Sequence, residues 1–328
     1  MSNGTGAAVV RGAAIVLIAA LVPLHARASD PAARAAIRDE MLARINADRL
    51  AAGLAAVRLD RSLSPTAAAY CERQLAERTV GHFATDGLAP YVRYSQAGLN
   101  DGIAENAVAW SAKYSFTPAG ALDLARRSHA AMMAETPPED SHRRAILDPH
   151  ATHVAIGSAW AGGEFRLVQI FVRRYIDWSD PPPRRALPGE RVRASGRAAA
   201  GWDVAGVSIH YEPLPGILSR ERANGIESYG LPPPSRELRP RRPAPRSAET
   251  RTLSAWVASG ASDGELLVAP AGGFSVTAPL DRGAGIYTLV VWLRNGSSDE
   301  PIAAAHISTI ASAAPPAQPG MNDAPAGP

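Results

Sequence analysis

Apolar side chains recur every three or four residues along three stretches of the N-terminal half of the chain. This spacing is typical of amphipathic helices packed against a core. Two of the stretches open with a hydroxyl residue followed by proline, a pair common at helix N-termini. The predicted helices cover residues 31–52, Ser64 to about Thr79, and Thr117 to about Met133.

Strands are predicted between and after these helices, where the apolar period changes to two. One strand candidate covers residues 103–110. Residues 152–160 and 164–173 alternate on either side of Gly162-Gly163, which is typical of a β-hairpin. The resulting element order predicts one domain, residues 31–176, in which helices cover a sheet.

The chemistry of the chain changes after residue 176. Residues 177–200 include Asp180-Pro181-Pro182-Pro183-Arg184-Arg185, which favours a stiff, polar linker. Residues 201–311 contain short strand candidates separated by turn residues, and we interpret them as a small antiparallel β-sandwich. The candidates are residues 204–211, 252–258, 265–269, 274–278, 286–293 and 302–310.

Two segments have compositions that do not favour a packed core. Residues 232–250 are rich in arginine and proline, and we expect a disordered insertion in the sandwich. The alternative is a strip that docks on anionic wall polymer or lipid headgroups. Residues 312–328, rich in alanine, proline and glycine, are predicted to be a disordered tail.

The N-terminal residues 1–28 have the pattern of a secretory signal peptide. Arg11 precedes an apolar run at residues 12–24, and Ala26-Arg27-Ala28 supplies small residues for cleavage after Ala28. We therefore expect a secreted or periplasmic protein. Because no later segment approaches about 18 consecutive apolar residues, no transmembrane segment is expected in the mature chain.

Cysteine usage excludes an intramolecular disulfide, and the charge balance argues against a nucleic-acid partner. The 328-residue chain has one cysteine, Cys71, so no intramolecular disulfide can form. Cys71 lies in a helical apolar pattern and is predicted to be a buried, inert thiol. The formal net charge of +3 includes Arg11 and Arg27 of the predicted signal peptide, so the mature chain is nearly neutral. We expect no nucleic-acid partner from this balance.

Five short blocks occur in order along residues 37–175. They are Ile45–Arg49 with Gly53-Leu54, His82 with Asp86-Gly87, Ala104-Glu105-Asn106, His142-Arg143 with Ile146-Leu147, and Thr152-His153-Val154 with Gly157. Together they resemble the bacterial form of the CAP superfamily, which includes cysteine-rich secretory proteins, antigen 5 and pathogenesis-related proteins. The resemblance implies an α+β fold, a three-layer α-β-α sandwich, here followed by the predicted β-sandwich.

The resemblance also implies a cleft whose floor carries two histidines and two acidic residues. His82, Glu105 and His142 match three of these positions. Glu135 is the fourth if Met132 stands where the family has a tryptophan. The run 135–141 is longer than the usual bacterial connection, so Glu139 and Asp140 stay as alternatives to Glu135.

Two imidazoles facing one cavity can hold Zn²⁺ through neutral nitrogens and leave positions for water. His82 and His142 are therefore candidate metal ligands. A carboxylate beside each ring would orient it or act as general base. The alternative is a buried hydrogen-bond network that joins helices to the sheet.

The sequence leaves open whether the protein is an enzyme. Ser141 cannot serve His142 as a nucleophile because adjacent side chains diverge, and no Gly-x-Ser-x-Gly motif is present. Our first hypothesis is an exported module that binds a small ligand, a peptide or a cell-envelope component. The second is a metal-dependent, peptidase-like hydrolase.

The remaining histidines are expected to have no role in the site. We predict a solvent-facing side chain for His129, a loop position for His150 and a structural position for His153. His210 and His306 fall on separate strands of the second domain.

Overall fold

A computed structural model of the chain describes residues 30–241, 264–296 and 300–313. The predicted signal peptide and the strand candidate at 252–258 lie outside the described residues. So do residues 242–250 of the predicted insertion and nearly all of the predicted tail.

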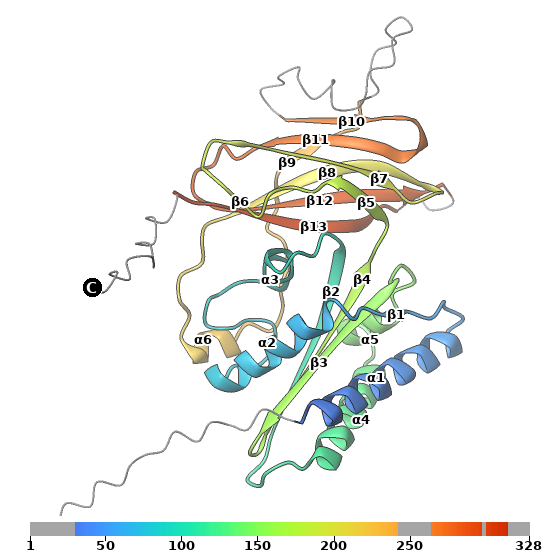
Figure 1. Ribbon diagram of the computed structural model, residues 1–328, viewed down its shortest axis with the longest axis vertical. Helices are drawn as coiled ribbons and strands as arrows, with labels where there is room; N and C mark the ends of the chain where they lie inside the picture. The colour runs from blue at the N-terminus through green and yellow to red at the C-terminus, as the bar shows by residue number, and fades with distance from the viewer. Residues whose placement is uncertain (1–29, 242–263, 297–299, 314–328) are drawn as a thin grey trace, which may run out of the picture.

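The N-terminal part is a four-stranded sheet with helices on both faces (Figure 1). The strand order is β1-β3-β4-β2, with β1 and β3 parallel and the other neighbours antiparallel. The strands are β1 (Arg58–Leu59), β2 (Gly102–Ser111), β3 (His153–Ala161) and β4 (Glu164–Arg173). The helices are α1 (Pro31–Ala51), α2 (Ser64–Glu77), α3 (Pro90–Gln96), α4 (Pro118–Met133) and α5 (Ser141–Ile146).

Both faces of this sheet are buried, as the side chains of β4 show. Phe165, Leu167 and Phe171 belong to the core shared with α1, α4 and α5. Val168 and Ile170 belong to the core shared with α2 and α3. Because successive strand residues point to opposite faces, one strand contributes to both cores. The predicted three-layer α-β-α arrangement is confirmed.

The two predicted helix starts differ in detail. Thr117 caps α4, and its Oγ1 accepts the backbone N–H of Gly120 at 3.1 Å. Ser64 is instead the first residue of α2, and its hydroxyl donates to the carbonyl oxygen of Asp60 at 2.7 Å. The Ser64 hydroxyl therefore supports the turn before α2 rather than capping the helix.

The C-terminal part consists of two sheets around a separate apolar core. One sheet has the order β10-β11-β7-β5 and the other β6-β13-β12-β8-β9. The first comprises β5 (Ile176–Asp180), β7 (Arg191–Ala198), β10 (Glu265–Val268) and β11 (Gly273–Pro279). The second comprises β6 (Arg185–Ala186), β8 (Trp202–Glu212), β9 (Pro234–Leu238), β12 (Gly285–Asn295) and β13 (Ile302–Ala311).

The prediction of a linker at residues 177–200 is wrong, because most of this segment forms β5, β6 and β7. In β7, Val192, Ala194 and Ala198 are buried, while Arg191 and Arg197 point outward. The alternation is that of a half-buried strand. Its outward arginines give the segment a polar composition, and that composition is what favoured a linker.

Residues 232–250 are also not a wholly disordered insertion. Residues 234–238 form β9, which pairs antiparallel with β8 at the edge of its sheet. Proline is tolerated at the first residue of an edge strand because no ladder hydrogen bond is required there. Pro234 occupies that position.

The two parts of the molecule pack directly against each other through β13, which lies over α3 and the start of β2 (Figure 1). The backbone N–H of Ser308 donates to Ser95 Oγ at 2.8 Å. At Gly102, an added Cβ would lie 2.2 Å from the carbonyl oxygen of Ala303. The glycine therefore lets the two backbones approach closely.

Candidate functional site

The site is built on β2, the strand at one edge of the four-stranded sheet. Successive side chains of a strand point to opposite faces. Glu105 lies on the face covered by α2 and α3, where its carboxylate meets Tyr94. Asn106 lies on the other face, where its amide donates to the carbonyl oxygen of His142 at 3.1 Å. One edge strand thus supports polar groups on both faces of the sheet.

Glu105 is the centre of the first polar cluster. Its Oε1 lies 2.9 Å from His82 Nδ1. Its Oε2 accepts Arg93 Nη2 at 2.8 Å and the hydroxyl of Tyr94 at 2.6 Å. Burial raises the pKa of Glu105, but the charge of Arg93 and the bonds from His82 and Tyr94 outweigh burial, so its pKa is lowered. Glu105 is therefore an ionised carboxylate with both oxygens bonded.

Arg93 joins this cluster to the loop that carries His82. Its guanidinium lies 3.4 Å from the centroid of the Tyr70 ring, a cation–π arrangement. Its Nη1 donates to the carbonyl oxygens of His82 at 3.2 Å and Leu88 at 3.3 Å. Arg93 therefore holds the backbone of His82 as well as the acid that orients the His82 ring.

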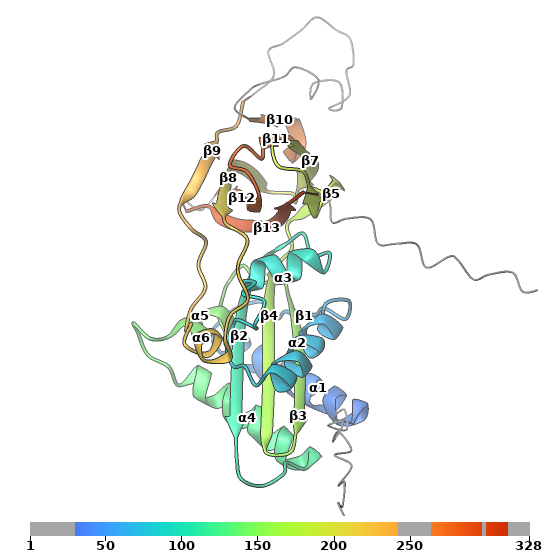
Figure 2. The same ribbon diagram turned by 90° about the vertical axis from the view of Figure 1, so that its left-hand side faces the viewer.

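A segment of the C-terminal part covers His82. We call residues 213–233, which connect β8 to β9 and contain α6 (Arg220–Asn224), the strap. Figure 2 shows both legs of the strap running from the sandwich down beside β2. The ring of Tyr229 meets the His82 ring edge-on with 4.6 Å between centroids. The hydroxyl of Tyr229 accepts the backbone N–H of Glu105 at 2.5 Å.

The strap is fixed to the N-terminal part at further points. The backbone N–H of Val80 donates to Asn224 Oδ1 at 2.8 Å, and that of Leu218 donates to the carbonyl oxygen of Thr85 at 2.8 Å. With the strap in place, the side chain of His82 is 10% exposed and that of Glu105 is fully buried. This pair, half of the predicted tetrad His82, Glu105, Glu135 and His142, is closed to solvent.

The second pair, His142 and Glu135, is more open. His142 Nδ1 lies 2.5 Å from Glu135 Oε1. Glu135 Oε2 accepts the backbone N–H groups of His142 at 3.0 Å and Arg143 at 3.3 Å. The side chains of His142 and Glu135 are 33% and 22% exposed. A ligand in solution can therefore reach this pair.

Of the three acids considered for the fourth position, Glu135 is the one that contacts His142. Glu139 is exposed. Asp140 Oδ1 instead lies 3.3 Å from Arg144 Nε. The structure thus arranges His82, Glu105, Glu135 and His142 as two His–Glu pairs on the faces of β2.

The two imidazoles are ligands of a type that Zn²⁺ prefers, but they are fewer than the three or four protein ligands that a zinc site normally has. Each imidazole uses Nδ1 for its glutamate, which leaves Nε2 of His82 and His142 for another partner, the arrangement usual for metal-binding histidines. Among the described residues, no group of three or more His, Cys, Asp or Glu side chains is placed to hold a metal ion. A metal ion that reached both rings would still have only two protein ligands, and binding by two ligands is weak.

Three residues of the first cluster were not predicted from the sequence. Arg93 and Tyr94 lie in the short helix α3, where a charged residue among buried ones is a signal that could have been noticed. Tyr229 lies 124 positions from Glu105, and no local pattern links the two.

The prediction that His129 faces solvent is wrong. His129 is 3% exposed, and its Nε2 lies 2.6 Å from Asp48 Oδ2. The ring lies on the face of α4 that packs against α1, along with buried Ala125 and Met132. Its polar partner on α1 is what permits the burial.

His150 and His153 have local structural contacts. The carbonyl oxygen of His150 accepts the hydroxyl of Tyr175 at 3.1 Å. The ring of His153 lies 2.9 Å from Thr152 Oγ1. Neither residue belongs to the two His–Glu pairs.

His306 also contacts the edge of β2. Its Nδ1 accepts the backbone N–H of Ile103 at 3.1 Å, two residues before the N–H bound by Tyr229. Burial lowers the pKa of His306 to about 3, with further lowering by Arg173 and His210. The ring is therefore neutral, as an acceptor must be. Together, His306 and Tyr229 satisfy two successive outward N–H groups of an edge strand.

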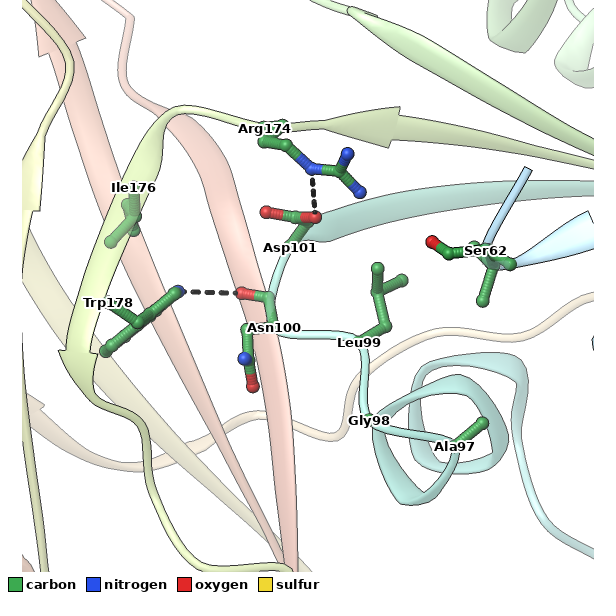
Figure 3. A pocket seen from close by; sticks show the side chains of 10 residues that line it. Ser62, Ala97, Gly98, Leu99, Asn100, Asp101, Arg174, Ile176 and Trp178 are labelled. Atoms are coloured by element: carbon green, nitrogen blue, oxygen red, sulfur yellow. Dashed lines mark hydrogen bonds and ion pairs between the residues drawn. The ribbon is translucent and has the colours of Figure 1, made fainter. Parts of the chain in front are cut away.

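A groove lies where the two parts of the molecule meet (Figure 3). Its volume is about 420 Å³. Arg174 donates to Asp60 Oδ2 at 2.6 Å and Asp101 Oδ2 at 2.9 Å. The indole N–H of Trp178 donates to the carbonyl oxygen of Asn100 at 3.2 Å. The charged groups of this groove are bonded to one another within the N-terminal part, while the bond of Trp178 joins β5 of the C-terminal part to Asn100.

Comparison with known proteins identifies the domain that carries the two pairs. Residues 42–172 match the family described as CAP, the cysteine-rich secretory protein family. This domain therefore belongs to the CAP family. A search of curated proteins gave no match.

Two solved structures are similar to the chain. One is an extracellular protein containing an SCP domain from Bacillus anthracis str. Ames, at 16% identity and a TM-score of 0.32, covering 43% of this chain and 41% of that one. The other is an outer surface protein from Borrelia burgdorferi, at 16% identity and a TM-score of 0.34, covering 42% of this chain and 93% of that one. The chain thus spans less than half the length of the first. Within the described ranges, none of the helices has the length and apolar character needed to cross a membrane.

Proposed function

We propose that this protein is an exported ligand-binding or surface-interaction module rather than an enzyme. The observation that carries the proposal is the state of Glu105. Both of its oxygens are bonded and its side chain is fully buried. A general base needs contact with the proton that it removes. Glu105 has no such contact, and the strap covers His82 beside it.

The open pair is the part of the site available to a ligand. His142 and Glu135 are partly exposed. His142 lies in the first turn of α5, and the carboxylate of Glu135 accepts backbone N–H groups of that turn. A small ligand, a peptide or a cell-envelope component would contact the protein there. The signal-peptide pattern of residues 1–28 supports an exported location for such a module.

The experiment compares binding with turnover in the mature protein, Ser29 onward. Binding to isolated cell-envelope material is measured by co-sedimentation, and hydrolysis is measured with peptide and ester substrates. We expect binding that His142→Ala weakens and that Arg61→Gln, a change at an exposed arginine, leaves intact. Turnover that His142→Ala abolishes would overthrow the proposal in favour of the hydrolase.

A weak divalent-metal site is a second candidate, and the orientation of the imidazoles favours it. With Nδ1 bonded to a carboxylate, Nε2 of His82 and His142 would bind the ion. A bound Zn²⁺ would supply Lewis acidity, as the metal-dependent hydrolase alternative requires. Zn²⁺ titration by calorimetry tests this site. Heat that disappears in the double variant His82→Ala/His142→Ala supports it, and no heat at micromolar Zn²⁺ removes it.

A further inference from the structure

A second groove, of about 290 Å³, lies beside α5. Three of its lining residues are arginines, two are aspartates and two are apolar. They are Asp140, Arg143, Arg144, Leu147, Asp148, Pro149 and Arg173. The groove is therefore lined by one more positive than negative side chain, and it lies on the helix that carries His142.

The three arginines differ in their partners. Arg173 Nε lies 2.7 Å from Asp148 Oδ2, and Arg144 Nε lies 3.3 Å from Asp140 Oδ1. Arg143 is half-buried, yet its guanidinium makes no hydrogen bond or ion pair with any residue that the structure describes. None of its nitrogens is a buried atom without a partner, so the guanidinium reaches solvent and can bind an acceptor that a ligand supplies.

The wall of the groove is rigid. Arg49 is fully buried, and its Nη1 donates to the carbonyl oxygens of Ile146 and Asp148, both at 2.8 Å. The carboxylate of Asp148 in turn holds Arg173. Because these residues are fixed before any ligand arrives, little ordering cost is left for binding.

We propose that this groove binds the oxyanion of a small ligand, a carboxylate or a phosphate, with Arg143 as the main charged contact. A guanidinium presents parallel N–H donors that match an oxyanion bidentately. Arg173 and Arg144 are paired with aspartates, so the net positive charge of the groove comes from Arg143. Leu147 and Pro149 contact the less polar remainder of the ligand. The inference rests on the proposed binding function and specifies the chemistry of its ligand.

The first test is a titration of the mature protein at constant ionic strength, followed by calorimetry or tryptophan fluorescence. The probes are inorganic phosphate and N-acetyl-D-alanine, which distinguish a phosphate from a carboxylate ligand, and sodium chloride is the control. We expect saturable binding of one probe and a loss of about tenfold or more in Arg143→Gln, because charge-assisted hydrogen bonds are strong. Arg61→Gln, at an exposed arginine outside the groove, is the matched control and retains binding.

A stability measurement separates ligand binding from a structural role. Since Arg143 has no acceptor in the described part of the chain, Arg143→Gln leaves the melting temperature of the free protein unchanged or raises it. A large fall in melting temperature would overturn the proposal. So would the absence of binding by both probes, equal affinity of wild type and Arg143→Gln, or competition by chloride at the same concentration.

The outcome is separable from that of the proposed function. If envelope material binds wild type and Arg143→Gln equally and neither probe binds, the oxyanion groove is refuted and the binding module stands. If a probe binds through Arg143 while envelope material does not sediment with the protein, the groove stands and the proposed surface interaction fails.

Discussion

At the scale of single residues, Glu105 is bonded to four different residues. Its carboxylate joins His82, Arg93 and Tyr94, and its backbone N–H reaches Tyr229. Removing one partner of a buried ion pair leaves the other charge uncompensated. Glu105 is therefore important for stability whatever the ligand is.

We expect Glu105→Gln to lower the free energy of unfolding by about 3 kcal/mol, because Arg93 loses its counter-ion inside the protein. Urea denaturation followed by circular dichroism measures the change. The control is Glu72→Gln, which removes the exposed partner of Arg34 and is expected to cost less than about 1 kcal/mol. Equal losses in the two variants would contradict the buried network.

His306 gives a pH dependence whose sign can be worked out. Burial lowers its pKa from 6.5 to about 3, so between these pH values the unfolded chain binds a proton that the folded chain does not. The stability contributed by neutral His306 is complete above pH 6.5 and is lost as the pH falls toward 3. Between pH 7 and pH 5, the loss is about 1 to 2 kcal/mol.

His306→Gln isolates this contribution, because glutamine has an acceptor for the N–H of Ile103 and does not titrate. The free energy of unfolding is measured at pH 7 and pH 5 for both proteins. We expect the wild type to lose more than the variant over this interval. Parallel losses would mean that His306 is protonated as easily in the folded chain as in the unfolded one.

At the scale of elements, the strap determines what solvent can reach. It crosses from the sandwich to the end of α2 and returns, and Tyr229, on the leg that returns to β9, lies over His82. The strap and β13 together cover the start of the free edge of β2. The same contacts that protect this edge from pairing also close half of the candidate site.

We expect Tyr229→Ala to expose His82. Histidine modification by diethyl pyrocarbonate, located by mass spectrometry, is expected to be slow at His82 in the wild type and several-fold faster in the variant. Tyr114→Ala, at a tyrosine that is 69% exposed, is the control. An unchanged rate at His82 would show that another group covers the ring.

At the scale of the whole molecule, the two parts behave as one packed unit. β13 lies on α3 and β2, and the contact at Gly102 leaves no space for a side chain. Gly102→Ala is expected to lower the free energy of unfolding by about 1–3 kcal/mol, since overpacking forces the backbones apart. Gly216→Ala, where an added Cβ meets nothing within 4 Å, is the control.

Thermal unfolding of Gly102→Ala is followed by calorimetry. A single transition at a lower temperature than wild type is expected if the two parts unfold together. Two separate transitions in the wild type would contradict the packing of β13 on the N-terminal part.

The sequence by itself determined the CAP domain and much of the sandwich. The apolar periods of α1, α2 and α4 and the alternation in β3 and β4 are local, so they can be recognised without a partner element. The short blocks around His82, Glu105 and His142 carried the resemblance to the family, and residues 42–172 match it.

Local composition misled where a strand's pairing partner is distant in sequence. β7 is rich in arginine because one of its faces is outside the sandwich, and only pairing with β11 and β5 shows that it is a strand. β9 begins with proline, and its local sequence predicts a loop. Only its pairing with β8 shows that it is a strand. The Pro181–Pro183 run lies between strands rather than in a long linker.

The tertiary structure alone decided which parts of the site are accessible. Tyr229 and Glu105 meet across 124 positions, and such a contact has no periodicity that a sequence can display. The same holds for Arg143: that its guanidinium has no acceptor among the residues the structure describes becomes visible only when its neighbours in space are known. Residue type and local spacing determined the helices, most strands and three of the four tetrad residues. Long-range packing decided that one His–Glu pair is closed and the other open.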